Sequence, residues 1–280
     1  MNPTAEYDLD RQLKSLWGAT GMPFGKSVRA PFRWPGFDRA GGRLHQAIAL
    51  RSSGVLTGPN GAGKSHLLSH CLSQLPDKQY ALIHLHHTSL TGSDILRSLC
   101  HRLGQKPRFR RSDTIELIGR SWSGLEGRFP VLVIDEAQNL TAPALEELRL
   151  LGCAHLDAHP LFSLILAGDD DLLPRLQLGV NRSLLTRLGF CIALEALTSQ
   201  ESADYIRSRL REVSMPEETI EPAACQLLWQ AGDGAPRTIN LLARQAIQNA
   251  AEEESAKIGP DHVQQAIEQL PWFAPAHTRG

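Results

Sequence analysis

The sequence predicts an α/β fold in which helices cover a parallel β-sheet, followed by a smaller unit made of helices alone. Three observations predict it. A glycine-rich loop at residues 58–65 stands between a short apolar run and a helical pattern. A second apolar run, at residues 130–134, ends in two adjacent carboxylates, and after Thr198 only helical patterns follow. Strands alternating with helices indicate a parallel α/β sheet, and a later run of helices indicates a separate unit.

The composition of the chain limits the classes of protein to which it can belong. The chain has 280 residues, of which 42% are hydrophobic and 21% charged, as in an ordinary globular protein. Its formal net charge of −1 excludes a surface coated in positive charge, so any nucleic-acid contact must come from a local patch. No apolar run approaches the ~20 residues of a membrane span, and the acidic start is unlike a signal peptide. We therefore expect a cytoplasmic protein that contacts no membrane.

The cysteines and histidines do not form a recognisable metal pattern. The five cysteines stand singly and lack the C-x-x-C spacing of zinc sites, so buried, reduced thiols are expected. Three histidines fall within the strand pattern at residues 80–87, but His84 and His86 share one face while His87 lies on the other. These histidines are therefore interpreted as the polar end of a strand rather than as a metal site. The cysteines are Cys71, Cys100, Cys153, Cys191 and Cys225.

The glycine-rich loop fits G-x-x-x-x-G-K-[ST], the phosphate-binding P-loop. Its three glycines let backbone N–H groups curl around phosphates, and the helix that follows offers its N-terminus to an anion. Lys64 would reach the β- and γ-phosphates, and the Ser65 hydroxyl would bind Mg²⁺. The loop thus predicts that the chain binds a nucleoside triphosphate with Mg²⁺. The expected nucleotide-binding residues are Gly58, Pro59, Asn60, Gly61, Ala62, Gly63, Lys64, Ser65 and His66.

The run Pro130–Ile134 is the second informative stretch. Consecutive, mostly β-branched apolar residues are typical of a strand buried on both faces of a parallel sheet. Asp135 and Glu136 then fall at its carboxyl end, where ligands bind in open α/β sheets. Asp135 suits a Mg²⁺ ligand, and Glu136 suits a base that orients and polarises an attacking water.

The remaining elements follow in chain order. The density of prolines in residues 1–40 predicts an extended, wrapping segment, and a short helix is expected over residues 40–51. Strands at residues 55–56, 80–87, 130–134, 161–167 and 190–194 give a five-stranded parallel sheet. Helices are expected at 65–75, 95–103, 113–125, 141–151, 198–213, 221–230, 237–253 and 259–270. The predicted parts are an N-terminal segment with the first helix (1–50), an α/β core (51–197) and a helical lid (198–280).

Polar residues at the helix starts predict their caps. Thr91, Thr141 and Thr198 are expected N-caps, and Asp113 with Glu116 has the spacing of a capping box. Three acids, Asp169–Asp171, follow the fourth strand. Asp169 is placed to touch the γ-phosphate or the attacking water, although these acids could equally form the cap and first turn of a helix.

A basic cluster lies between the second and third strands. Lys106, Arg108, Arg110 and Arg111 surround the single aromatic residue Phe109. Such a cluster suits the phosphate backbone of DNA. The alternative is a solvated loop between two helices, and the cluster taken alone favours that alternative.

Several stretches together resemble the ExeA-type branch of the AAA+ ATPases, whose relatives include the transposition helpers MuB, TniB and IstB. The resemblance covers nearly the whole chain. Its motifs are Met22–Lys26, Val133–Leu140, Leu145–Leu151, Leu166–Gly168 and Gly234–Asn240.

The resemblance implies roles for individual residues. Asp135 and Glu136 take the Walker B positions, and Arg237 matches the sensor arginine of a lid helix that contacts the γ-phosphate. Arg187 matches the arginine that reaches a neighbouring subunit's nucleotide as a finger, the alternative being a surface arginine. Asp169 replaces the glutamine that the family commonly carries after its fourth strand, and a carboxylate there would repel the γ-phosphate unless it is protonated or paired.

The resemblance also implies a function. It suggests an ATPase that assembles with ATP on double-stranded DNA as a ring or filament, largely without sequence preference. Such a protein recruits or stimulates a transposase and disassembles on ATP hydrolysis, with Lys106, Arg108, Arg110 and Arg111 contacting the DNA. One alternative is a secretion-system ATPase like ExeA, which carries a membrane helix after its ATPase domain; about ten residues follow the last expected helix here, so we expect no such helix. Another is an ATP-gated interaction switch that does not bind DNA.

Overall fold

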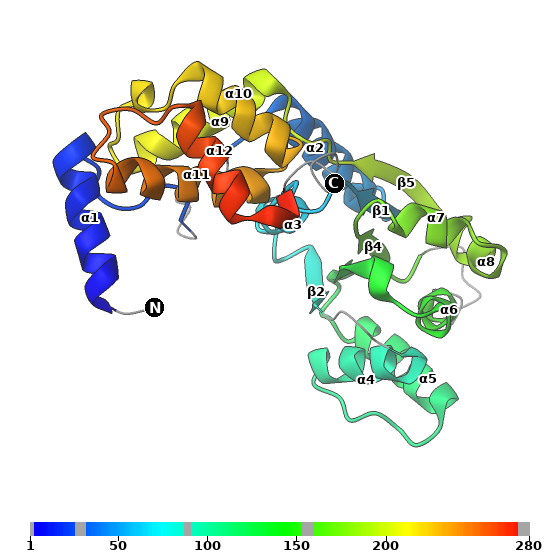
Figure 1. The fold of residues 1–280 in the computed structure, drawn as a ribbon. Helices are drawn as coiled ribbons and strands as arrows, with labels where there is room; N and C mark the ends of the chain where they lie inside the picture. The colour runs from blue at the N-terminus through cyan, green and yellow to red at the C-terminus, as the bar shows by residue number, and fades with distance from the viewer. Residues whose placement is uncertain (1–2, 26–31, 87–90, 153–159, 274–280) are drawn as a thin grey trace. The chain divides into compact units, whose positions relative to one another are not determined.

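The computed structural model describes residues 3–25, 32–86, 91–152 and 160–273. The chain forms two compact units (Figure 1). The sheet unit contains Pro35–Asn60 and Lys64–Glu195, and the helical unit contains Met1–Trp34, Gly61–Gly63 and Ala196–Gly280. The division into 1–50, 51–197 and 198–280 stays a prediction.

The sheet unit is built on five parallel strands in the order β2-β3-β4-β1-β5, which confirms the predicted fold class. Since all the strands run in the same direction, their carboxyl ends share one edge of the sheet. The strands are β1 (Ser53–Thr57), β2 (Tyr80–His86), β3 (Phe129–Asp135), β4 (Ser163–Ala167) and β5 (Leu188–Ala193).

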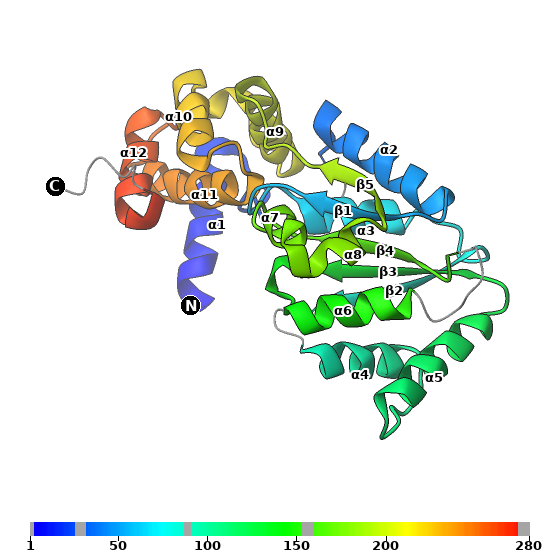
Figure 2. The same ribbon diagram turned by 90° about the vertical axis from the view of Figure 1, so that its right-hand side faces the viewer.

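Helices cover both faces of this sheet, with α2 and α3 on one side and α4 and α6 on the other (Figure 2). Every residue of β3 is buried, as expected for a strand with helices on both faces. Leu132 and Ile134 pack with Leu99 and Leu148 in a hydrophobic core cluster. The helices of this unit are α2 (Pro35–Ala49), α3 (Lys64–Leu72), α4 (Gly92–Arg102), α5 (Arg111–Ser123), α6 (Ala142–Leu151), α7 (Leu172–Gln177) and α8 (Arg182–Leu185), with 3-10 turns η1 (Ala137–Asn139) and η2 (Gly179–Asn181).

The helical unit contains the four helices predicted after Thr198. Thr198 begins the first of them with a capping box, since its hydroxyl accepts from the Glu201 N–H (3.3 Å) and the Glu201 carboxylate accepts from the Thr198 N–H (2.9 Å). The elements are α1 (Pro3–Trp17), α9 (Ser199–Glu212), η3 (Glu217–Thr219), α10 (Pro222–Gly232), α11 (Pro236–Glu252), α12 (Pro260–Gln269) and η4 (Pro271–Phe273).

The prediction of an extended N-terminal segment is wrong for residues 3–17, which form α1. Pro3 stands at the first helical position, where its missing N–H costs no helical hydrogen bond, and the next proline is Pro23, beyond the helix. Trp17 is buried and donates its indole N–H to the Ala256 carbonyl (3.0 Å). α2 likewise begins at Pro35, earlier than expected, because proline is well placed at a helix start.

The aromatic residues that precede α2 pack within the helical unit. The rings of Phe32 and Trp34 stack with centroids 6.2 Å apart, and Phe32 meets Tyr205 of α9 edge-on at 5.3 Å. The Tyr205 hydroxyl donates to Asn240 Oδ1 of α11 (2.7 Å). This part of the predicted wrapping segment therefore packs on α9, and Tyr205 links α9 to α11.

The cap predictions are mostly confirmed. Thr91 is the N-cap of α4, and Thr141 caps α6 by accepting from the Ala144 N–H (3.3 Å). The start predicted at Asp113 is wrong, because Arg110 is the N-cap of α5. The start of α7 matches the alternative in which Asp169–Asp171 precede a helix, whereas α8 was not predicted, since four residues are too few to show a helical period.

The cysteine prediction is confirmed in part. Cys71, Cys100 and Cys225 are buried, and burial raises the pKa of Cys100 and Cys225. Cys191 is exposed, contrary to expectation, because it lies on the edge strand β5. Cys153 lies outside the described residues. Among the described helices, none is both long and apolar enough to cross a membrane.

Candidate nucleotide-binding site

The P-loop connects β1 to α3. Its first residue, Gly58, must be a glycine because the neighbouring backbone lies too close for a side chain. A Cβ on Gly58 would lie 2.3 Å from the carbonyl oxygen of Leu194, so no larger residue fits without moving the backbone. The Leu194 N–H donates to the Thr57 carbonyl (2.8 Å), which holds the start of the loop beside the end of β5.

Gly61 and Gly63 belong to the helical unit and have φ angles of +81° and +104°, which favour glycine. The Gly61 carbonyl accepts from the Arg237 N–H (3.2 Å), and a Cβ on Gly61 would lie 2.8 Å from the Arg237 Cβ. Arg237 is exposed and lies in the first turn of α11, directly after Pro236. Trp34, which was not predicted as a site residue, lies beside the position of a Cβ on Gly63 (3.9 Å).

Lys64, the first residue of α3, is only 7% exposed. Its Nζ donates to the carbonyls of Gly58 (2.7 Å) and Pro59 (3.0 Å). Burial lowers the pKa of Lys64, and the nearby carboxylates oppose this shift. The ammonium group therefore sits in a poorly hydrated position, held by two backbone oxygens and facing negative charge. The carboxylates are those of Glu136, Asp169, Asp170 and Asp135.

The two predicted Mg²⁺ ligands are hydrogen-bonded to each other. The Ser65 hydroxyl of α3 donates to Oδ2 of Asp135, at the end of β3, over 2.7 Å. Asp135 is 3% exposed, whereas Ser65 is exposed. Hydroxyl and carboxylate oxygens are the ligands that Mg²⁺ prefers, so this donor set fits the ion.

Glu136 follows in a left-handed backbone conformation, with φ 54° and ψ 38°. This conformation costs a non-glycine residue roughly 1–2 kcal/mol, so the surrounding contacts must hold it. The Glu136 N–H donates to Oδ1 of Asp135 (3.0 Å), and the Gln138 side-chain amide donates to Oε2 of Glu136 (2.7 Å).

Gln138 is a site residue that the sequence analysis missed. Its side chain is 8% exposed, and its Oε1 accepts from the Asp169 N–H (3.4 Å). Its backbone carbonyl accepts from Arg175 of α7. A Cβ on Gly168 would lie 2.7 Å from this Oε1, so the glycine leaves room for the amide. Its position two residues after Glu136 was the only sign in the sequence that it could contact that carboxylate. A glutamine at that position does not by itself indicate a role.

Asp169 takes part in the turn that leads into α7. Its Oδ1 accepts from the Asp171 N–H (3.1 Å), and its carbonyl accepts from the Leu172 N–H (3.1 Å). The same carboxylate lies near enough to Lys64 to oppose the lowering of the Lys64 pKa. Both alternatives raised by the sequence, a helix start and a contact with the site, thus have a geometric basis.

Arg187 is not brought to this site within one chain. It is exposed and directly precedes β5, so it lies at the amino ends of the strands, opposite the edge that carries Ser65 and Asp135. There it lines a cavity of about 370 Å³ together with Arg51 and Arg149.

The histidines occupy separate positions. His66 is exposed on α3, with its ring 6.2 Å from that of Phe37. His86 pairs in register with Asp135, and His87 lies outside the described residues. Across the described ranges, no three His, Cys, Asp or Glu side chains cluster as a metal site.

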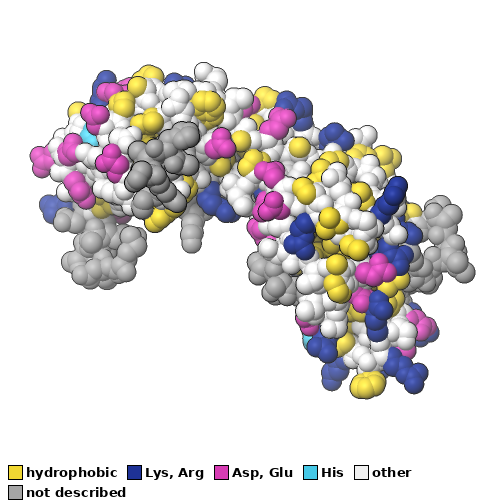
Figure 3. All heavy atoms as spheres, turned by 45° about the vertical axis from the view of Figure 1, so that its right-hand side comes forward, with side chains coloured by type: hydrophobic (Ala, Val, Ile, Leu, Met, Phe, Trp, Pro, Cys, Tyr) yellow, Lys and Arg dark blue, Asp and Glu magenta, His cyan; other side chains and the backbone are white. Residues whose placement is uncertain are grey.

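The basic cluster forms the loop between α4 and α5. Lys106, Arg108, Phe109 and Arg110 are exposed, Phe109 fully so. Figure 3 shows dark-blue basic side chains at the lower end of the sheet unit, where α4 and α5 lie.

Two contacts fix this loop. The buried Thr114 hydroxyl accepts from the Arg108 N–H (3.1 Å) and lies 3.2 Å from the carbonyl oxygens of Arg108 and Arg110. Arg111 differs from the other basic residues because its guanidinium pairs with Glu147 of α6 (2.7 Å). Thr114 thus holds a loop whose tip carries two arginines and an aromatic ring.

Taken together, the strand order, the P-loop after β1 and the carboxylate pair after β3 define the P-loop AAA+ fold. Residues 48–176 match the family model of the AAA domain. In sequence, the chain is similar to General secretion pathway protein A of Aeromonas hydrophila, with 28% identity over 251 residues. The match covers 87% of this chain and 46% of that protein, so the chain spans less than half of its relative.

Solved structures share the fold. Cdc6p from Pyrobaculum aerophilum matches with a TM-score of 0.67 and 18% identity, over 88% of this chain and 70% of that chain. The Aeropyrum pernix ORC1 protein, solved in complex with DNA, matches with a TM-score of 0.62 and 18% identity, over 86% and 66% of the two chains. At these identities the matches show the fold alone. The predicted ExeA-type likeness is supported by the AAA domain and the similarity to the secretion protein.

The close contact at Gly58 gives a direct stability test. Gly58→Ala should lower the free energy of unfolding by about 1–3 kcal/mol, because its Cβ must displace the Leu194 carbonyl. Gly42→Ala on α2 is the control, since nothing lies within 4 Å of its Cβ; it should raise stability by about 0.5–1 kcal/mol. Urea denaturation followed by circular dichroism measures both. Equal stability of the two variants would contradict the described loop geometry.

Proposed function

We propose that the chain is an ATP-hydrolysing, DNA-binding regulator of DNA transposition. It would assemble on double-stranded DNA as an ATP-bound oligomer, recruit or stimulate a transposase, and disassemble after hydrolysis, in the cytoplasm. The observation that carries the ATPase part is the 2.7 Å contact between Ser65 and Asp135, beside the buried Lys64. The DNA and transposition parts depend on the basic loop and on the sequence resemblance.

Nucleotide binding would replace the present partners of Lys64. Its ammonium group now uses two carbonyl oxygens, and phosphate oxygens are stronger acceptors because they are charged. The backbone of residues 58–66 and the N-terminus of α3 would hold the β- and γ-phosphates. Ser65 and Asp135 would hold Mg²⁺, which neutralises phosphate charge when bound.

Hydrolysis would use Glu136 to orient and deprotonate the attacking water. Gln138 would act as a positioning residue, since its amide fixes one Glu136 oxygen and leaves the other available. Arg237 would contact the γ-phosphate from α11, and its backbone bond to Gly61 supports that role. Asp169 would contact the attacking water through the face of its carboxylate not used in the turn before α7.

Arg187 would act only between copies of the chain. It lies at the edge of the sheet opposite its own P-loop. It could therefore stabilise transition-state charge only on the nucleotide of a neighbouring copy, not on its own. Arg51 would add positive charge around the neighbour's phosphates, whereas Arg149 is paired with Glu146 (2.7 Å) and would contribute less. This arrangement would couple hydrolysis to assembly and favours a ring or filament.

The loop between α4 and α5 would contact DNA. Arg108 and Arg110 are exposed on a loop that Thr114 fixes, whereas Arg111 is committed to Glu147 and would contribute less. Contacts to phosphates alone bind DNA without sequence preference. One such patch in each subunit of an oligomer would multiply its effect in a chain of net charge −1.

A second candidate function is an ATPase subunit of a secretion system. The similarity to General secretion pathway protein A, 28% identical over 251 residues, favours it. A third candidate is an ATP-gated interaction switch without DNA binding. These two candidates share the ATPase site with the first and differ from it in the basic loop's role.

The chemistry is tested by two substitutions. Lys64→Ala should weaken ATP binding at least ~10- to 100-fold, because a charge-assisted contact to phosphate is lost. Glu136→Gln should bind ATP as the parent does but hydrolyse it at least ~100-fold more slowly. Calorimetry and phosphate release measure the two effects. The control, Glu218→Gln, alters an exposed carboxylate of the helical unit. Parental hydrolysis by Glu136→Gln would remove Glu136 from the mechanism.

The positioning role of Gln138 predicts a change in turnover without a change in binding. Gln138→Ala should lower kcat about tenfold while KM stays within about twofold, because Glu136 loses its fixed orientation. Gln138→Glu removes the amide donor and puts a second carboxylate beside Glu136, so it should lower kcat at least as much while KM again changes little. An unchanged or raised kcat for Gln138→Ala would contradict the role.

The DNA-binding role is tested by Arg108→Ala combined with Arg110→Ala. ATP binding should be unchanged, while the slope of log affinity against log salt should become shallower by about 2 units, near 0.9 per lost phosphate contact. Gel shifts with and without ATP provide the measurement, and Arg43→Ala with Lys78→Ala is the matched control, since both residues are exposed and neither lies in the loop. An unchanged slope would remove the loop from the proposal. A parent protein that binds ATP but no DNA would favour the second or third candidate.

A further inference from the structure

The outer edge of β2 is the starting observation. In the strand order of the described sheet, β2 comes first and pairs only with β3. An edge strand presents a row of unpaired N–H and C=O groups, which natural proteins usually protect with lysine, proline or a bulge. β2 (Tyr80–His86) carries none of these, since its sequence is Tyr-Ala-Leu-Ile-His-Leu-His and its register with β3 is continuous. Its free edge is therefore open to another strand.

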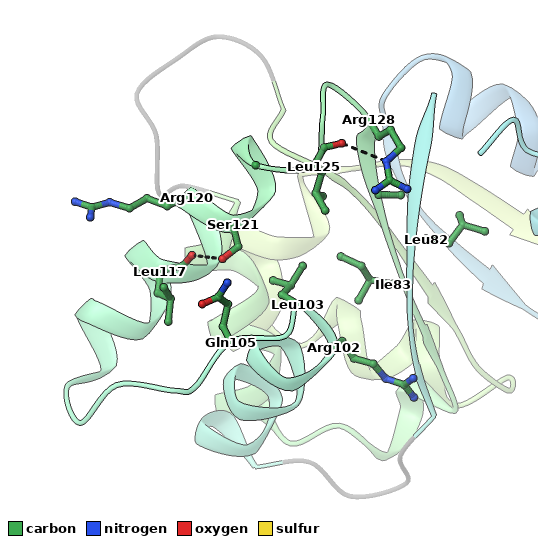
Figure 4. Close-up of a pocket in the computed structure, with 12 residues that line it drawn as sticks. Leu82, Ile83, Arg102, Leu103, Gln105, Leu117, Arg120, Ser121, Leu125 and Arg128 are labelled. Atoms are coloured by element: carbon green, nitrogen blue, oxygen red, sulfur yellow. Dashed lines mark hydrogen bonds between the residues drawn. The ribbon is translucent and has the colours of Figure 1, made fainter. Parts of the chain in front are cut away.

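A groove of about 630 Å³ runs along this edge (Figure 4). Ala81, Leu82 and Ile83 all line it, although Leu82 and Ile83 project to opposite sides of β2. A groove that is lined by both faces of a strand follows its edge. Leu82 is 42% exposed, which is unusual for an apolar residue of a sheet. The groove thus offers both strand backbone and apolar surface.

The other wall of the groove is apolar with a basic rim. Leu103 caps the end of α4, Leu117 lies on α5 and Leu125 follows α5, and near them lie Arg102, Arg120 and Arg128. The lining residues include three arginines and no carboxylate. Arg120 is paired with Glu116, whereas Arg102 and Arg128 have no carboxylate partner among the described ion pairs. Arg128 donates through its Nε to the Leu125 carbonyl (3.2 Å), which leaves its two terminal nitrogens for an occupant. Two cationic groups are therefore available to an occupant.

We propose that this groove binds an extended segment of a partner protein, which adds as a strand to β2. Main-chain hydrogen bonds give affinity in this mode of recognition, and pockets for alternate side chains give specificity. Leu82 and the leucines of the opposite wall select apolar side chains, and Arg102 and Arg128 select acidic ones. The partner segment thus alternates apolar and acidic residues. A nucleic acid lacks the peptide N–H and C=O pattern that matches a strand edge.

The groove is separate from the nucleotide site. It uses the first half of β2, whereas Ser65 and Asp135 meet at the edge formed by the carboxyl ends of the strands. The proposal therefore does not depend on ATP hydrolysis or on DNA binding. Variants of the groove should leave ATP binding unchanged.

The test begins with a display library of random eight-residue peptides, selected on the full chain. Selected peptides should carry alternating acidic and apolar residues. A synthetic copy should bind with an affinity that falls at least tenfold for Arg102→Glu combined with Arg128→Glu, and severalfold for Arg102→Glu alone. The control, Arg43→Glu combined with Arg97→Glu, should stay within about twofold, and circular dichroism confirms that each variant folds.

Strand addition has its own signature. Methylating alternate backbone nitrogens of the peptide should abolish binding, because those N–H groups pair with β2. Hydrogen exchange should slow at those of residues 81–83 whose N–H groups point away from β3 when the unmethylated peptide binds. Selected peptides without acidic residues, or equal binding to the charge-reversed variants, would overturn the proposal. So would full affinity of the methylated peptide, displacement by inorganic phosphate at millimolar concentration, or preferential binding of a DNA oligonucleotide to the groove arginines.

Discussion

The hydrogen bond from Ser65 to Asp135 is the contact on which the site depends. It joins the helix after β1 to the end of β3, although β4 lies between these two strands in the sheet. Only a parallel sheet with its carboxyl ends aligned brings the two residues together from positions 70 apart in the chain. The register of β1 with β4, and of β4 with β3, therefore fixes the distance between the two oxygens.

Charge at this edge of the sheet is unbalanced. Asp135, Glu136, Asp169 and Asp170 face a single buried ammonium group, that of Lys64. Burial disfavours that cation, and the carboxylates and two carbonyls partly compensate. Such a site has room for a divalent cation near the carboxylates and for phosphate near the lysine. A ligand that brings both charges suits it better than either charge alone.

The sequence was sufficient for the parts of the fold that leave a local signal. The glycines of the P-loop, the apolar run of β3 and the threonine caps each reflect a constraint within a few residues, and each was found. α1 was missed because the prolines from position 23 onward were extended in error to the whole segment. Gln138 was missed as a site residue because its residue type alone indicates no role, although it lies two residues after Glu136. Trp34 was missed because only the fold brings it to Gly63.

The basic loop shows the same limit. Its four basic residues are evident in the sequence. That Arg111 forms an ion pair while the other three stay exposed depends on Glu147, 36 residues away on α6. Thr114 likewise fixes the loop through contacts that no spacing rule indicates. The groove along β2 could be recognised only once the strand order was known, since the sequence alone does not distinguish an edge strand from a central one.

The most direct measurement is a structure of the full chain with Mg²⁺ and a non-hydrolysable ATP analogue. We predict that the Lys64 ammonium group exchanges its hydrogen bonds to the carbonyls of Gly58 and Pro59 for hydrogen bonds to phosphate oxygens. We also predict that Mg²⁺ lies between the Ser65 hydroxyl and Asp135. If the chain binds no nucleotide, or if Lys64 stays on those carbonyls with the analogue bound elsewhere, the account is contradicted.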